Sequence, residues 1–156
     1  MTMCMIFNNL NNLPVVAQFE SLYGAQIARW YPELTNISIY TDQQGEGFIK
    51  KWDDRNDSPY TSNHVMNEIM RSEDVYNRCG FTIEEEYAIL AHELGHMIAG
   101  VRGEKAQNNL QEEKNADQMT VKLGLANHMK SAIQKMIDYR IHPANNPEML
   151  QRIAVL

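Results

Sequence analysis

The sequence contains no long hydrophobic run, and no apolar stretch approaches the roughly 18 residues that a membrane span needs. The first residues, MTMCMIFNNLNNLP, have neither the basic segment nor the apolar core of a secretory signal. Lys and Arg are scattered and the net charge is −6, so the chain lacks the concentrated positive charge that binds nucleic-acid phosphates. We therefore expect a cytoplasmic protein that contacts neither membranes nor nucleic acids.

Cysteine is also scarce. The two cysteines, Cys4 and Cys79, form no CxxC pair, which favours two buried thiols and argues against a zinc site built from a cysteine cluster. Internal repeats, low-complexity tracts and Pro- or Gly-rich linkers are absent from the 156 residues. Residues 1–156 are therefore expected to form a single domain, with an upper part over about 1–103 and a helical lower part over about 104–156.

Hydrophobic spacing predicts a mainly helical chain. One helix begins at Thr82. Others are expected over residues 13–30, about 63–77, about 109–124 and about 126–140, and in a last short stretch that begins at Pro147.

Strand signals are confined to the first half. Ile37 and Ile39 alternate with polar neighbours, as in a half-buried strand, and a second strand is expected at FIKKW, residues 48–52. Residues 53–63 have the composition of a loop. Together these elements predict an α+β fold with a small N-terminal sheet packed beside the helices.

The best-marked element begins at Thr82. Thr82 and Glu85 have the spacing of a capping box, and the acids Glu84–Glu86 fill the first turn, where the helix dipole favours negative charge. The helix is expected to run through IEEEYAILAHELGHMIAG and to end near Gly100 or Gly103.

This helix carries an HExxH motif, His92-Glu93-Leu94-Gly95-His96. Residues four apart lie on the same face of a helix, so both imidazoles can bind one metal ion. Glu93 is rotated around the helix axis and can reach a metal-bound water without being a ligand. Gly95 inside a helix costs about 1 kcal/mol relative to alanine, which indicates close approach by another segment.

A catalytic zinc ion usually takes three protein ligands. A third histidine six residues after the motif is excluded, because Arg102 stands there. The segment EEKNAD on the following helix supplies a carboxylate instead, from Glu112 or Glu113. We prefer Glu113, because Asp117 lies four residues on and can accept the Nδ1 hydrogen of a ligating histidine, most naturally that of His92.

These residues resemble a known group. ILAHELGHMIAG followed by EKNADQMTVKLG is similar to the HExxH…ExxAD pattern of gluzincins, in particular the soluble minigluzincins and the catalytic core of the HtpX/CAAX-protease family. The segment from His142-Pro143 to Arg152-Ile153 and Leu156 resembles the HP…RI..L ending of that catalytic domain. The likeness covers about residues 80–156, and Gln151 stands where the family has an acidic residue.

The resemblance implies a zincin-like fold with one Zn²⁺ per chain on His92, His96 and Glu113. It implies Glu93 as the general base, with Asp117 supporting a ligating histidine. The expected function is that of a zinc metalloendopeptidase, which hydrolyses peptide bonds through a zinc-bound water activated by Glu93.

Three further features of the mechanism are hypotheses. His142, with Tyr139 behind it, is the candidate for stabilising the gem-diolate, although it could instead bind zinc as a fourth ligand or be structural. Glu93 is expected to act first as a base and then as an acid. A peptide or protein substrate could pair with a strand edge, for which ISIYT, residues 37–41, is a candidate.

Two alternative functions stay open. The ExxA pattern also resembles ImmA/IrrE-type peptidases, which act on a specific regulatory partner. A latent zinc-binding protein is the other, with its cleft blocked by the apolar C-terminal segment, residues 153–156. The sequence predicts no oligomeric state.

Overall fold

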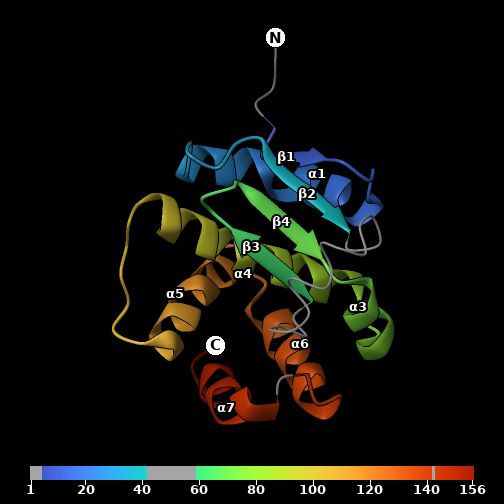
Figure 1. The fold of residues 1–156 in the computed structure, drawn as a ribbon, viewed down its shortest axis with the longest axis vertical. Coiled ribbons are helices and arrows are strands. Elements are labelled where there is room, and N and C mark those ends of the chain that lie inside the picture. The colour runs from blue at the N-terminus through green and yellow to red at the C-terminus, as the bar shows by residue number, and fades with distance from the viewer. Residues whose placement is uncertain (1–4, 42–58, 142) are drawn as a thin grey trace.

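A small sheet above a long central helix organises the fold (Figure 1). The computed structural model describes residues 5–41, 59–141 and 143–156. Four strands are present in these ranges: β1 (Phe7–Asn9), β2 (Ile37–Thr41), β3 (Tyr60–Asn63) and β4 (Glu68–Arg71). The α+β fold predicted from the sequence is thereby confirmed.

Helices make up most of the described chain. They are α1 (Pro14–Trp30), α3 (Glu73–Cys79), α4 (Ile83–Val101), α5 (Asn109–Lys122), α6 (Ala126–Asp138) and α7 (Asn146–Val155), with a short 3-10 helix at Pro143–Asn145. The helices predicted on either side of the HExxH helix are confirmed at α1, α5, α6 and α7, with ends shifted by a few residues. None of the helices in these ranges has the length and apolar character needed to cross a membrane.

The sheet has the order β1-β2-β4-β3. The first three of these strands run parallel to one another, and β3 runs antiparallel to β4. In β2, Ile37, Ile39 and Thr41 are buried and the residues between them are half-buried, which is the alternation that the sequence predicted. α1 connects β1 to β2 and, together with α4, covers one face of the sheet (Figure 1).

The helix predicted over about 63–77 is wrong. This stretch is a β3–β4 hairpin followed by the shorter α3. The Asn63 side chain accepts a hydrogen bond from the backbone N–H of Met66 at 3.1 Å, and Asn67 has a left-handed φ of 54°, so asparagine turn chemistry closes the hairpin. Ser72 then accepts a hydrogen bond from the N–H of Val75, which starts α3 ten residues later than predicted.

The loop predicted over 53–63 is also wrong at its end, because residues 60–63 form β3. The predicted strand at residues 48–52 lies outside the described residues. In α1, Phe19 and Ile27 are fully buried, whereas Leu22 is 62% exposed.

The start of α4 is fixed by contacts in both directions along the chain. The capping box is confirmed: Thr82 donates its N–H to Glu85, and the Glu85 N–H donates to the Thr82 hydroxyl. Glu85 also accepts hydrogen bonds from Lys135 and Ser131 of α6, each at 2.6 Å. The helix is therefore tied to the lower part of the fold at its first turn.

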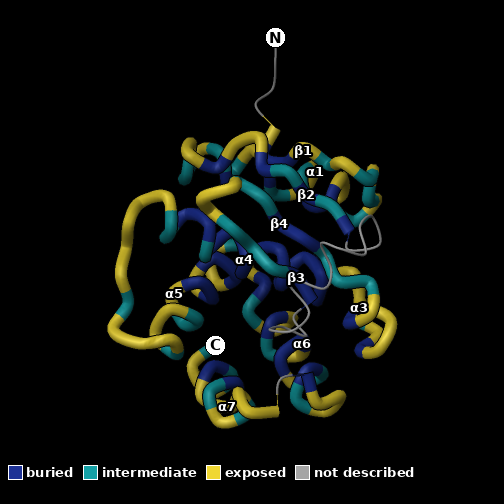
Figure 2. The backbone as a smooth tube through the Cα atoms, in the orientation of Figure 1, coloured by how far each residue is buried: buried dark blue, intermediate teal, exposed yellow. Residues whose placement is uncertain are grey.

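α4 is buried along most of its length, which Figure 2 shows as a dark tube through the middle of the molecule. β3 lies on one side of it, and α5 and α6 pack on the other. At Gly95 the packing leaves no room for a side chain, because an added Cβ would lie 2.5 Å from the carbonyl oxygen and 2.8 Å from Cα of Ala116. The close approach predicted at Gly95 is thus a backbone contact with α5.

We predict that Gly95→Ala destabilises the protein by about 1–2 kcal/mol, because overpacking costs more than the roughly 1 kcal/mol of helix propensity that alanine gains. Gly100→Ala on the same helix is the matched control, since the atoms nearest to the new methyl group belong to the exposed His64 side chain, which can adopt another rotamer, and not to backbone. Urea unfolding of the two variants measures the difference. Equal stability of the two variants would contradict the account of the α4–α5 contact.

Candidate metal centre

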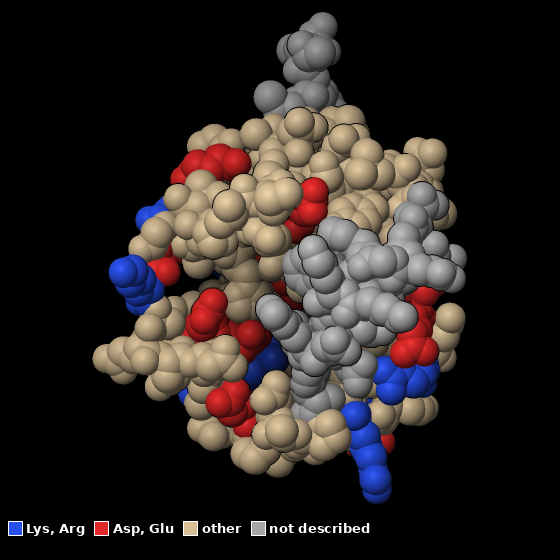
Figure 3. Space-filling view, in the orientation of Figure 1, with Lys and Arg blue, Asp and Glu red and all other residues tan. Residues whose placement is uncertain are grey.

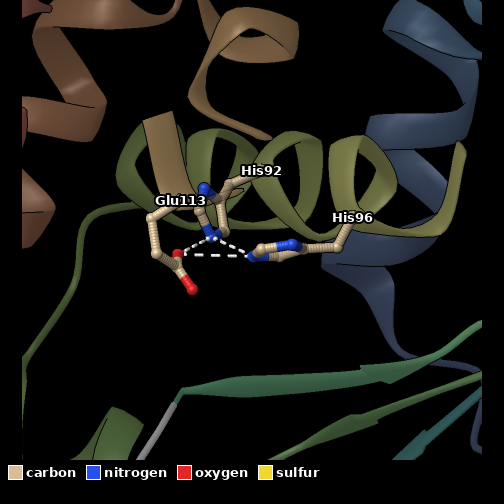
Figure 4. Close-up of side chains that lie close together, drawn as sticks. All are labelled: His92, His96 and Glu113. Carbon is tan, nitrogen blue, oxygen red and sulfur yellow. Dashed lines mark hydrogen bonds and ion pairs between the residues drawn. The ribbon is translucent and has the colours of Figure 1, made fainter. Parts of the chain in front are cut away.

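His92 and His96 lie one turn apart on α4 and direct their rings to the same point (Figure 4). Their Nε2 atoms are 3.0 Å apart. His92 is buried, at 5% exposure, whereas His96 is partly open to the cleft. The HExxH spacing has therefore brought together two nitrogen ligands that lie beside the core yet remain reachable from one side.

Glu113 reaches the same point from α5. Its Oε2 lies 2.9 Å from Nε2 of His92 and 3.3 Å from Nε2 of His96. Asn108 is the N-cap of α5, and its side chain accepts a hydrogen bond from the N–H of Gln111. The close approach of α5 to α4 at Gly95 brings the Glu113 carboxylate within reach of the histidines. Of the two acids weighed from the sequence, Glu113 joins the histidines and Glu112 is exposed.

The chemistry of this group fits a metal ion. Ligand atoms at the corners of a tetrahedron with zinc bonds of about 2.0–2.1 Å are about 3.3 Å apart. The three separations in the structure are 2.9, 3.0 and 3.3 Å. Two imidazole nitrogens and a carboxylate oxygen are also a ligand set that zinc accepts, so His92, His96 and Glu113 could hold one ion.

Asp117 supports His92 from behind. Its Oδ1 lies 2.7 Å from Nδ1 of His92, and both side chains are almost fully buried. A carboxylate accepts but cannot donate, so Nδ1 of His92 carries a hydrogen and Nε2 is the nitrogen that faces the metal position.

Arg152 of α7 is the residue that the sequence reasoning missed. Its guanidinium donates to both oxygens of Asp117, at 2.9 and 2.8 Å, and lies 3.7 Å from Glu113. In the sequence, Arg152 is notable only as part of the terminal segment that resembles the HP…RI..L ending of a family. No local pattern links it to Asp117, 35 residues earlier.

The charges at this site shift the pKa values of its members. Burial opposes protonation of His92, but the carboxylates of Asp117 and Glu113 outweigh burial and raise the pKa of His92 to about 10. Burial likewise opposes the charged form of Glu113, yet hydrogen bonds with His92 and His96 lower the pKa of Glu113 well below its usual range. In the metal-free protein, the raised pKa therefore favours a proton on Nε2 of His92, where a metal ion would otherwise bind.

Glu93 lies beside this group without joining it. Its side chain lines the same cleft as both histidines and is 9% exposed. Within the described part of the chain, no hydrogen bond or ion pair engages the Glu93 carboxylate. Its carboxylate is therefore available to a water or substrate in the cleft.

The cleft has a volume of about 960 Å³ and lies between β3, α4, α5 and α7. Acidic side chains border the hollow in the space-filling view (Figure 3), and the acids that line the cleft are Glu93, Glu104, Glu112, Glu113 and Glu148. Tyr60, Thr61 and Ser62 of β3 form part of its upper wall. Within the described part of the chain, the cleft therefore runs beside β3.

The suggestion that residues 37–41 offer a strand edge is wrong, because β2 pairs with β1 on one side and β4 on the other. Among the described strands, β3 has the free edge beside the cleft. His142 lies outside the described residues, so its role stays a prediction. Tyr139 is 53% exposed at the end of α6.

Comparisons with protein-family models, curated proteins and solved structures give no match to this chain. The resemblance to gluzincins therefore stays a prediction that rests on the motifs quoted above.

We predict that zinc binding near neutral pH releases about one proton, because the ion must displace the proton that the raised pKa places on His92. Titration calorimetry in buffers of different ionisation enthalpy measures this release. In Asp117→Asn the main cause of the raised pKa is removed, so fewer protons are expected. A binding heat that is the same in every buffer would show that His92 is already neutral in the metal-free protein.

Proposed function

We propose that the protein is a zinc-dependent metallopeptidase of the gluzincin type. The observation that carries the proposal is the convergence of His92, His96 and Glu113 on one point, with the Glu93 carboxylate in the same cleft and in no hydrogen bond or ion pair with another described residue. A zinc ion held there would supply a Lewis acid that activates water near neutral pH and polarises a carbonyl group.

Glu93 has the chemistry of the proton carrier in this reaction. As a carboxylate it accepts a proton from the attacking water, and as a carboxylic acid it then donates that proton to the leaving nitrogen of the peptide. Asp117 keeps the Nδ1 hydrogen of His92 engaged throughout, so His92 stays a neutral ligand. No other residue needs to exchange a proton in this scheme.

The edge of β3 supports a peptide rather than a small amide as the substrate. One side of β3 pairs with β4, and the strand forms part of the cleft wall above α4. An extended peptide that added to this edge would place its carbonyl groups over the metal position. We propose this binding mode in place of pairing with residues 37–41.

The two alternative functions are cleavage of a regulatory partner and a latent zinc-binding protein. Cleavage of one regulatory partner, as in ImmA/IrrE-type peptidases, would use the same chemistry, and no feature of the described structure favours it. A latent form with its cleft blocked by residues 153–156 is less well supported, because Ile153 and Leu156 pack against the core and none of these four residues lines the cleft.

The remaining expectations complete the proposal. We propose one Zn²⁺ per chain, a peptide or protein as the partner, no binding of nucleic acid, and a cytoplasmic location. The net charge of −6 supports the absence of nucleic-acid binding, since phosphates would be repelled.

We predict that Glu93→Gln lowers peptidase activity by about 10²- to 10⁴-fold while zinc content stays at the wild-type level, since the amide cannot accept a proton. Cleavage of a proteome-derived peptide library, read by mass spectrometry, measures activity without assuming a substrate sequence. Glu112→Gln is the matched control, because Glu112 lines the cleft but lies outside the ligand group. Full activity in Glu93→Gln would contradict the mechanism.

A further inference from the structure

We propose that Arg152 is a positioning residue that holds the Asp117 carboxylate against Nδ1 of His92, and thereby sets the geometry of the metal ligands from the C-terminal helix. The inference rests on the proposed metal site, because it assigns Arg152 a role in how that site binds its ion. It makes α7 a part of the metal centre, although α7 supplies no ligand.

The contact between Arg152 and Asp117 is a bidentate salt bridge. Nε of Arg152 donates to Oδ2 of Asp117 at 2.9 Å, and Nη2 donates to Oδ1 at 2.8 Å. The side chains are only 7% and 3% exposed. A planar guanidinium that engages both oxygens fixes the plane of the carboxylate as well as its position, which a single hydrogen bond cannot do.

His92 shares one of these oxygens. Oδ1 of Asp117 lies 2.7 Å from Nδ1 of His92 and also accepts from Nη2 of Arg152. The Nη2 and Nδ1 atoms are 3.4 Å apart. Both are donors, so they cannot bond to each other, and each instead points its hydrogen at Oδ1. The arrangement thus keeps the hydrogen of His92 on Nδ1 and leaves Nε2 for the metal.

Glu113 and Asp117 stand four residues apart on α5, and Arg152 lies beside both, with its Nη1 3.7 Å from Oε2 of Glu113. Without Arg152, the buried Asp117 would keep the single N–H of His92 as its donor among the contacts described. A buried carboxylate with so few partners is costly, so it would turn toward water or take up a proton. Either change weakens its hold on His92.

A purely electrostatic role for Arg152 predicts the opposite result. A positive charge near the site repels a metal cation, so its removal alone would tighten zinc binding. A positioning role predicts that removal weakens zinc binding. The sign of the change in affinity therefore separates the two roles.

The test is a double-mutant cycle on zinc affinity, measured by competition with a chromogenic chelator, in Arg152→Gln, Asp117→Asn and the double variant. Each single change is expected to weaken zinc binding by roughly 10-fold or more. The double variant is expected to bind no more weakly than Asp117→Asn, because Arg152 acts through Asp117. Unchanged or tighter binding in Arg152→Gln, or losses that multiply in the double variant, would overturn the inference.

Two controls separate positioning from stability and from charge. Ile153→Ala loosens the packing of α7 next to Arg152, and it is expected to lower the melting temperature while changing zinc affinity by less than about twofold, well below the roughly 10-fold effect of a lost supporting contact. Arg152→Lys keeps the charge but not the planar fork, so it is expected to recover only part of the affinity. Wild-type affinity in Arg152→Lys would overturn the inference, because it would show that charge alone suffices.

The visible spectrum of the cobalt-loaded protein adds a readout of ligand geometry. The bands are expected to shift in Arg152→Gln and to stay unchanged in Ile153→Ala. A shift of equal size in both variants would mean that Arg152 acts only through the docking of α7. Failure of the wild type to take up any zinc would instead refute the proposed function, so the two failures are distinguishable.

Discussion

The close contact between α4 and α5 is the constraint on which the site depends. The two backbones meet at Gly95 and Ala116, where no side chain fits between them. Gly95 stands between the two histidines in the sequence, and Ala116 stands three residues after Glu113, so a small change in helix separation changes both distances from the Glu113 carboxylate to the histidines. The sheet above α4 and the helices below it hold that separation, because α4 packs on both sides.

Charge is arranged around this contact so that most buried acids face a cation from another element. The pairs are Glu85–Lys135, Glu86–Arg71 and Asp117–Arg152. Glu93 makes no hydrogen bond or ion pair among the described residues, and Glu113 faces two imidazoles at 2.9 and 3.3 Å and Nη1 of Arg152 at 3.7 Å. Glu93 and Glu113 therefore place negative charge in the cleft, which would favour the binding of a divalent cation there.

Features with a local signal could be predicted from the sequence, and features that depend on distant contacts could not. The capping box at Thr82 and the spacing of the HExxH motif are local, and α4 follows from them. β1 and β3 are three and four residues long, too short for an alternation to stand out, and the turn after Asn63 falls in a stretch whose spacing predicts a helix. The contact of Arg152 with Asp117 joins two helices that are remote in sequence, so no periodic pattern in the sequence predicts it.

The measurement that tests the central claim most directly is X-ray absorption at the zinc edge, on protein loaded with one equivalent of zinc. The account predicts a first shell of nitrogen and oxygen at about 2.0 Å, outer-shell scattering from two imidazoles, and no sulfur neighbour. A sulfur shell at about 2.3 Å, or scattering from fewer than two imidazoles, would contradict a site built from His92, His96 and Glu113.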